Sequence, residues 1–177
     1  MTYSADRRDM KYILETERLR LRQFSTADAK FILELVNSPG WLEFIGDRNV
    51  KTEEQAIAYL QNGPINSYEV NGFGLSLVEL KSSKAAIGMC GIIRRDNLEK
   101  PDIGFALLPE FMGKGYAFEI ASATLTFAKE QLKIPSLWAV TVPNNKASIT
   151  LLEKIGMKFL KPFYFPGKTE ELMLFTT

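Results

Sequence analysis

The sequence contains no histidine among its 177 residues and a single cysteine, Cys90. Without histidine there can be no Ser-His-Asp triad, no Cys-His pair and no histidine-ligated metal. One cysteine excludes an internal disulfide and a multi-cysteine zinc site, so we expect no bound metal and a reducing compartment. Any acid or base that the protein uses must therefore be Asp, Glu, Tyr, Cys, Lys or water.

The sequence also lacks a strong charge imbalance and a long apolar run. Its formal net charge is +1, which supplies no general attraction to nucleic acid. No apolar run approaches the roughly 20 residues of a membrane span, and the charged N-terminus has no apolar core of signal-peptide length. We therefore expect a cytoplasmic, soluble protein that binds neither nucleic acid nor a membrane, as a monomer or a homodimer.

The length and composition predict one domain. A chain of 177 residues with 46% hydrophobic content can bury one core, and the sequence has no repeat, Gly/Ser linker or low-complexity tract. We therefore predict a single domain over residues 1–177, in which residues 1–16 form an N-terminal extension.

Hydrophobic periodicity predicts an α/β chain. Strand patterns occur at 18–24, 72–80, 85–95, 101–109, 136–142, 157–165 and 170–176. Helical patterns occur at 25–37, 52–62, 116–132 and 145–156. In the first strand apolar residues alternate with Arg18, Arg20 and Arg22, which predicts that this strand is half exposed. Short polar turns between the early strands imply antiparallel neighbours, whereas the later strands cross over through helices.

Two glycines flank a lysine where the strand at 101–109 leads into the long helix, in "PEFMGKGYAFE". The first turn of a helix leaves backbone N–H groups without internal partners, and its positive dipole end favours an anion. Gly113 and Gly115 would let the backbone approach a phosphate, and Lys114 would add a positive charge. The loop is neither a P-loop nor a dinucleotide fingerprint, because Gly115 follows the lysine and Phe118 replaces a third glycine. The alternative is a turn that needs its glycines for geometry alone.

Three blocks of sequence resemble the GNAT superfamily of N-acetyltransferases, and within it the branch that acetylates ribosomal-protein alanines (RimJ/RimL type). "DIGFALLPEFMGKGYAFEIA" is similar to the family's acetyl-CoA loop, with Glu110, Gly113 and Gly115 at its three marked places. Glu110 departs from the usual Gln or Arg and matches the version of the loop found in that branch. "VPNNKASITLLEKIGMKF" is similar to the branch's Asn-x-x-Ser block, and "LETERLRLRQFSTADA" to its opening. The blocks follow the family order and span nearly the whole chain.

The resemblance implies a GNAT fold and acetyl-CoA as cosubstrate. The fold is one twisted mixed sheet with helices on both faces, splayed between its fourth and fifth strands. The pyrophosphate would be held by the backbone amides of Met112, Gly113, Lys114, Gly115, Tyr116 and Ala117. The pantetheine arm would lie along Phe105, Ala106 and Leu107. Asn145 matches the family's asparagine that reaches the cofactor, and Ser148 the residue that faces the leaving sulfur, although both also suit an ordinary helix start.

The acid and base of the reaction are less clear from the resemblance. Many relatives use a glutamate on the fourth or fifth strand as base and a tyrosine on the following helix as acid, but Val140 and Leu152 stand at two of these places. Asp102, at the start of the fourth strand, is the best remaining carboxylate, with Glu79 after it. A surface salt bridge is the alternative for either. Cys90 lies in an apolar strand with no histidine to activate it, so we expect it to be inert.

These observations together predict an acetyl-CoA-dependent N-acetyltransferase. The acceptor is a primary amine, and we favour the α-amine of a protein or peptide N-terminus, attacked directly without a covalent intermediate. Three alternatives stay open: an acetyltransferase for a polyamine, amino acid or drug, a non-catalytic acyl-CoA-binding module, and a nucleotide-binding domain that uses the same loop.

Overall fold

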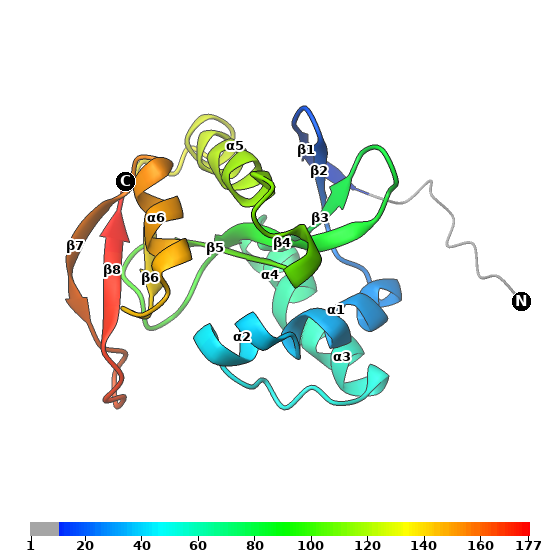
Figure 1. Cartoon of the computed structure of the whole chain (residues 1–177), viewed down its shortest axis with the longest axis horizontal. Coiled ribbons are helices and arrows are strands. Elements are labelled where there is room, and N and C mark those ends of the chain that lie inside the picture. Colours follow the sequence, from blue (N-terminus) through cyan, green and yellow to red (C-terminus); the bar gives the residue numbers. More distant parts are fainter. Residues whose placement is uncertain (1–10) are drawn as a thin grey trace, which may run out of the picture.

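The structure is a computed structural model that describes residues 11–177. Within these residues one open sheet has eight strands in the order β1-β2-β3-β4-β5-β6-β8-β7 (Figure 1). The strands are β1 Tyr12–Glu15, β2 Leu19–Arg22, β3 Leu75–Leu80, β4 Ala86–Ile93, β5 Asp102–Leu107, β6 Trp138–Thr141, β7 Lys158–Phe163 and β8 Leu172–Thr176. Neighbours are antiparallel except β5 and β6, which are parallel. The predicted mixed sheet is confirmed, and its fourth and fifth predicted strands are β5 and β6.

Helices cover both faces of the sheet, as predicted. They are α1 Ala29–Val36, α2 Pro39–Phe44, α3 Glu53–Leu60, α4 Asn66–Asn71, α5 Tyr116–Glu130 and α6 Lys146–Lys154. Leu77 and Met89 of the sheet pack with the buried side chains of α1 to α3, while Val78 and Ile103 pack with those of α5 and α6. Figure 1 shows α1 to α3 below the strands and α5 above them. Among residues 11–177, no helix combines the length and the apolar character that crossing a membrane requires.

Three short elements were not predicted from the sequence. Strand β1 lies within residues 1–16, which we expected to form an extension, and it pairs with β2 at the edge of the sheet. Helix α2 begins at a proline and buries Trp41, which is 5% exposed. Helix α4 continues from α3 through a π-helical turn at Gln61–Ile65 that contains Pro64, and ends at Gly72 with φ of 79°. Packing stabilises these elements more than their local sequence does.

On the face of β2 that was predicted to be exposed, Arg20 is partly exposed but Arg22 is buried, so the prediction was wrong at Arg22. This arginine is 8% exposed. Its Nη2 lies 2.8 Å from Asp28 Oδ1, and its Nε lies 3.3 Å from Glu79 Oε2. The two carboxylates compensate the guanidinium charge, which allows its burial.

Candidate functional site

The predicted splay lies between β5 and β6. These strands are paired at one register position only, Asp102 opposite Trp138, where the Trp138 N–H donates to the Pro101 carbonyl at 2.9 Å. Beyond it, in the part of the chain that the structure describes, residues 103–107 pair with β4 on one side and with no strand on the other. Because β5 and β6 are parallel, α5 and α6 both begin beside the open end of this divergence.

The start of α5 has unused hydrogen-bond donors. Gly113 and Gly115 adopt the left-handed conformation, with φ of 72° and 81°, and Gly115 occupies the N-cap position without a side-chain cap. Within residues 11–177, the six successive amides of residues 113–118 have no hydrogen-bond acceptor; Glu119 is the first to bond, to the Gly115 carbonyl at 3.0 Å. Free amides at the positive end of a 15-residue helix form a site for an anion.

The loop that carries these amides is open to solvent. Met112, Gly113, Lys114 and Gly115 are exposed, and Tyr116 and Ala117 are half-buried. The Lys114 ammonium lies 5.7 Å from the centre of the Phe111 ring. Of the six amides predicted to hold the pyrophosphate, those of residues 113–117 are free, whereas the Met112 amide donates to the Pro109 carbonyl at 3.2 Å.

The residues predicted to follow the pantetheine arm form the last part of β5. The Phe105 and Leu107 side chains pack with the core beneath α5 and α6, whereas Ala106 packs on the opposite face. The backbone edge of this segment that does not face β4 is the one left without a strand partner in the described chain. It can therefore offer backbone donors and acceptors to an extended ligand.

The start of α6 supplies the second predicted pair of residues. Asn145 is the N-cap, and its Oδ1 accepts a hydrogen bond from the Ser148 amide at 3.2 Å. Its interpretation as an ordinary cap is confirmed. The Ser148 hydroxyl, half-buried, makes no hydrogen bond to any residue from 11 to 177. This hydroxyl is therefore available to a ligand at the open end of the divergence.

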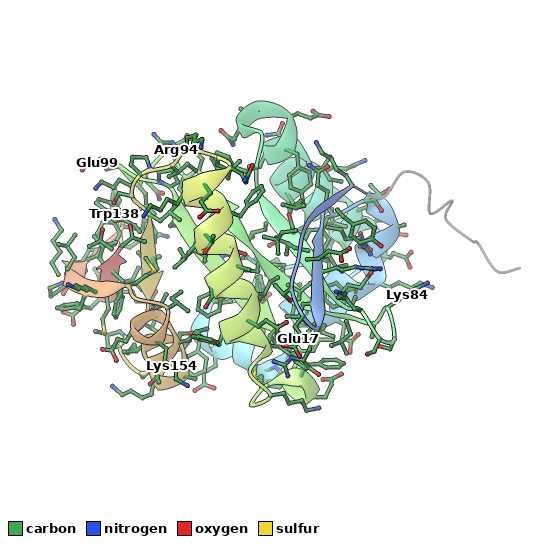
Figure 2. All side chains as sticks on the ribbon, turned by 90° about the horizontal axis from the view of Figure 1, so that it is seen from above. Glu17, Lys84, Arg94, Glu99, Trp138 and Lys154 are labelled. Carbon is green, nitrogen blue, oxygen red and sulfur yellow. The ribbon has the colours of Figure 1, made fainter. Side chains whose placement is uncertain are left out.

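Asp102 lies at the closed end of the divergence, roughly 17 Å along the strand from Leu107 at about 3.3 Å per residue. Figure 2 shows the same relation: Trp138 marks the closed end, and Glu17 lies near the loop at the other end of α5. Asp102 is 1% exposed, and its Oδ1 accepts a hydrogen bond from Arg95 Nε at 2.9 Å. Burial raises the pKa of Asp102, while the Arg95 guanidinium opposes that rise. The alternative of a salt bridge is thus present, with its Asp102 side buried and its Arg95 side partly exposed.

The remaining ionisable candidates are not at the divergence. Glu79 lies on β3, two strands away from β5, where it is buried and bonded to Arg22 and Tyr12. Cys90 is buried against Thr124, and burial raises the pKa of its thiol to about 12, so it carries no thiolate at neutral pH. Leu152, at one of the family's usual acid-base places, is 1% exposed in the core.

Sequence reasoning gave no role to Thr16, Arg18 and Glu119, which bond to one another beside the loop. Thr16 and Arg18 reach Glu119 in the first turn of α5, and Arg18 also reaches the Lys114 carbonyl. The "TERL" block that contains Thr16 and Arg18 could have pointed to them, but sequence analysis used it only as a resemblance to the family. Its contact with the loop depends on residues about 100 positions apart, which no local pattern reveals.

Comparison with known proteins places this geometry in a family. The family model described as an acetyltransferase (GNAT) domain matches residues 18–158, which is most of the chain. The chain belongs to the GNAT acetyltransferase family. The matched region contains the loop of α5, the divergence of β5 and β6, and the start of α6. The protein is thus an acyltransferase, as predicted.

Individual GNAT proteins match over most of the chain. The uncharacterized N-acetyltransferase YoaA of Bacillus subtilis (strain 168) is 30% identical over 147 residues, which cover 82% of each protein. The acetyltransferase structure from Agrobacterium tumefaciens str. C58 is 25% identical, with a TM-score of 0.78 over 93% of this chain and 92% of that one. The structure of RimL, described as a ribosomal L7/L12 α-N-protein acetyltransferase in complex with coenzyme A, is 16% identical and shares the fold, with a TM-score of 0.79 over 94% of this chain and 97% of that one.

Proposed function

We propose that the protein transfers the acetyl group of acetyl-CoA to the α-amine at the N-terminus of a protein or peptide. The observation that carries the cosubstrate is the row of free amides at residues 113–118, which includes two left-handed glycines and lies at a helix N-terminus. A pyrophosphate is the anion that such a row suits, because several donors converge on several oxygens. The coenzyme A bound by RimL, which shares the fold, supports the same choice.

The residues around the divergence fit the other parts of acetyl-CoA. The loop amides would bind the pyrophosphate, and the free edge of Phe105, Ala106 and Leu107 would pair with the amides of the pantetheine arm. Asn145 would lie beside the arm at the start of α6. The thioester then points into the divergence between β5 and β6, where Ser148 has an unused hydroxyl.

The chemistry requires positioning and little else from the protein. The thioester supplies the acetyl group; the amine nitrogen attacks its carbonyl carbon, a C–N bond forms, and the C–S bond breaks. The sulfur leaves with the electron pair and takes up a proton, and the amide nitrogen loses one, so the products are an N-acetyl amide and coenzyme A. The Ser148 hydroxyl would donate a hydrogen bond to the departing thiolate, which lowers the barrier for this step.

The preference for an α-amine rests on the pairing of both carboxylates that were candidates for the base. Asp102 is paired with Arg95, Glu79 with Arg22, and Val140 and Leu152 replace residues that relatives use. An α-amine has a pKa near 7.7 to 8.0 and a lysine amine near 10.4. At neutral pH the α-amine therefore costs about 3 to 4 kcal/mol less free energy to deprotonate. A site without a strong base therefore favours an acceptor that arrives already neutral.

Thermal unfolding tests the cosubstrate. A ligand present at 100 times its dissociation constant adds about 2.7 kcal/mol to the free energy of unfolding. We expect acetyl-CoA and coenzyme A to raise the melting temperature, and ATP and NAD to leave it unchanged. Stabilisation by ATP or NAD, without stabilisation by either CoA compound, would overturn the assignment.

Competition between two peptides tests the acceptor. One peptide has a free N-terminus and no lysine; the other has the same sequence with a blocked N-terminus and one lysine. After addition of acetyl-CoA, mass spectrometry should show acetylation of the first peptide. Labelling of the lysine peptide, or of polyamines and small amines only, would contradict the α-amine as acceptor. It would leave the assignment as an acetyltransferase intact.

A further inference from the structure

Arg18 contacts both backbone and side-chain atoms of the proposed pyrophosphate loop. Its Nη1 donates to the Lys114 carbonyl at 3.0 Å, and its guanidinium carbon lies 4.5 Å from the centre of the Tyr116 ring. A Cβ added at Gly115 would lie 3.3 Å from Arg18 Nη2, so the guanidinium packs directly against that glycine. One side chain, from the residue just before β2, therefore touches three successive residues of the loop.

The bond to Lys114 determines which way the next amide points. In a trans peptide, the carbonyl of one residue and the N–H of the following residue point in opposite directions. Arg18 holds the Lys114 carbonyl toward itself, so the Gly115 N–H points away from Arg18. Glycine permits the flipped orientation of this peptide at little steric cost, so the loop needs an external contact to fix one orientation.

Arg18 is itself fixed by Glu119 in the first turn of α5. Its Nε donates to Glu119 Oε2 at 2.7 Å and its backbone N–H to Glu119 Oε1 at 2.9 Å, while the Thr16 hydroxyl also donates to Oε1. Burial disfavours ionisation of Glu119, but these hydrogen bonds outweigh it and hold the pKa of the carboxyl below its usual value. The carboxylate lies near a helix end that is to bind an anion, and Arg18 compensates its charge.

We propose that Arg18 is a positioning residue for acetyl-CoA: it holds the Lys114–Gly115 peptide so that the Gly115 amide faces the pyrophosphate. The proposal rests on the acetyl-CoA part of the proposed function and is independent of the acceptor. It gives the "TERL" block a role, because Thr16 and Arg18 both come from that block and both bind Glu119. Compensation of the Glu119 charge alone is the competing explanation.

Four proteins separate these explanations: the wild type, Arg18→Gln, the double variant Arg18→Gln/Glu119→Gln, and the control Arg20→Gln. Arg20 lies two residues further along the chain, within β2, and is paired with Glu15 at 2.9 Å instead of contacting the loop. For each protein, calorimetry gives the dissociation constant of coenzyme A, thermal unfolding gives the melting temperature without ligand, and kinetics with the preferred acceptor give kcat and both KM values.

We expect Arg18→Gln to raise the dissociation constant of coenzyme A about tenfold, since it removes a charge-assisted hydrogen bond that orders the loop. The KM for acetyl-CoA should rise in parallel, with kcat, the KM of the acceptor and the ligand-free melting temperature nearly unchanged. The double variant should bind as weakly as Arg18→Gln, because removal of the Glu119 charge does not restore the contact to Lys114. Arg20→Gln should bind like the wild type.

Three results would overturn the proposal. Wild-type affinity in Arg18→Gln would show that the loop orders itself, and recovery of affinity in the double variant would leave only charge compensation. Equal weakening in Arg20→Gln would show a general effect of charge on this strand. A wild-type protein that does not bind coenzyme A would instead contradict the cosubstrate, which is a separate outcome.

Discussion

Helices α3 and α5 begin in opposite ways. The first turn of α3 is closed by its own side chains: Thr52 Oγ1 accepts from the Gln55 amide at 3.2 Å, and Gln55 Oε1 accepts from the Thr52 amide at 3.2 Å. The first turn of α5 has a glycine at the N-cap and no side-chain cap. A capping box stabilises a helix, whereas an uncapped start keeps its donors for a ligand. The difference separates a helix end that serves the fold from one that is free to bind.

The start of helix α6 combines the two cases, because it has a side-chain cap and also a free hydroxyl. Substitution of Ser148, which carries that hydroxyl, should have the largest effect on activity. Asn145 caps the amide of Ser148, which leaves the hydroxyl free. Loss of a hydrogen bond to a charged group costs about 1.5 to 3 kcal/mol, so Ser148→Ala should lower kcat about 10- to 100-fold, with little change in coenzyme A affinity. Steady-state kinetics with chemistry as the slow step measure this. Thr150→Ala, an exposed hydroxyl of the same helix, is the control, and an equal loss there would remove Ser148 from the mechanism.

A side chain at the start of α5 should disturb binding next most. Gly115→Val places a branched residue at φ of 81° and within 3.3 Å of Arg18, so we expect coenzyme A to bind about tenfold more weakly, or about 1.4 kcal/mol. Gly167→Val is matched in backbone strain, with φ of 75°, and stands in the turn between β7 and β8. It should lose stability without losing affinity. Normal binding by a folded Gly115→Val would place the pyrophosphate elsewhere.

The start of α3 should show the reverse behaviour. Thr52→Ala removes the acceptor for the Gln55 amide and should lower the free energy of unfolding by about 1 kcal/mol, within a range of about 0.5 to 2. The affinity for coenzyme A should not change, because this helix covers the other face of the sheet. Urea unfolding and calorimetry on the same sample measure both quantities. Weaker binding in Thr52→Ala would mean that the two helix starts are not independent.

The smallest expected effect concerns pH and Glu119. Hydrogen bonds from Thr16 and Arg18 hold its pKa below the ordinary value of 4.5, despite partial burial. Such a carboxylate stabilises the folded state above pH 4.5, and the contribution is lost as the pH falls through the lowered pKa. Urea unfolding from pH 7 to pH 3 should therefore show a smaller acid-side loss of stability in Glu119→Gln than in the wild type. Parallel curves would show that the interaction adds nothing to stability.

The sequence predicted the elements whose residues carry a regular pattern, and missed the contacts between distant ones. The start of α5 at Tyr116 and the cap at Thr52 follow from local rules, since glycines and a capping residue act within one turn. The burial of Arg22 could not be predicted, because its partner Glu79 is 57 positions away.

Two charged residues show the same limit at the site. Asp102 was the best remaining carboxylate, with a surface salt bridge as the alternative, but its position on β5 buries it beside Arg95. The proposed role of Arg18 depends on a contact with the Lys114 carbonyl across 96 positions. Periodicity gives the face of a strand on which a residue lies, and only the packed fold shows what covers that face.

Amide NMR of the isotope-labelled protein during a titration with coenzyme A tests the central claim most directly. The account predicts that the largest changes in chemical shift occur at the amides of residues 113–118, which have no acceptor in the described chain, while the capped amides of Thr52 and Gln55 do not move. Saturation with coenzyme A that leaves residues 113–118 unchanged, with the shifts gathered elsewhere, would contradict it.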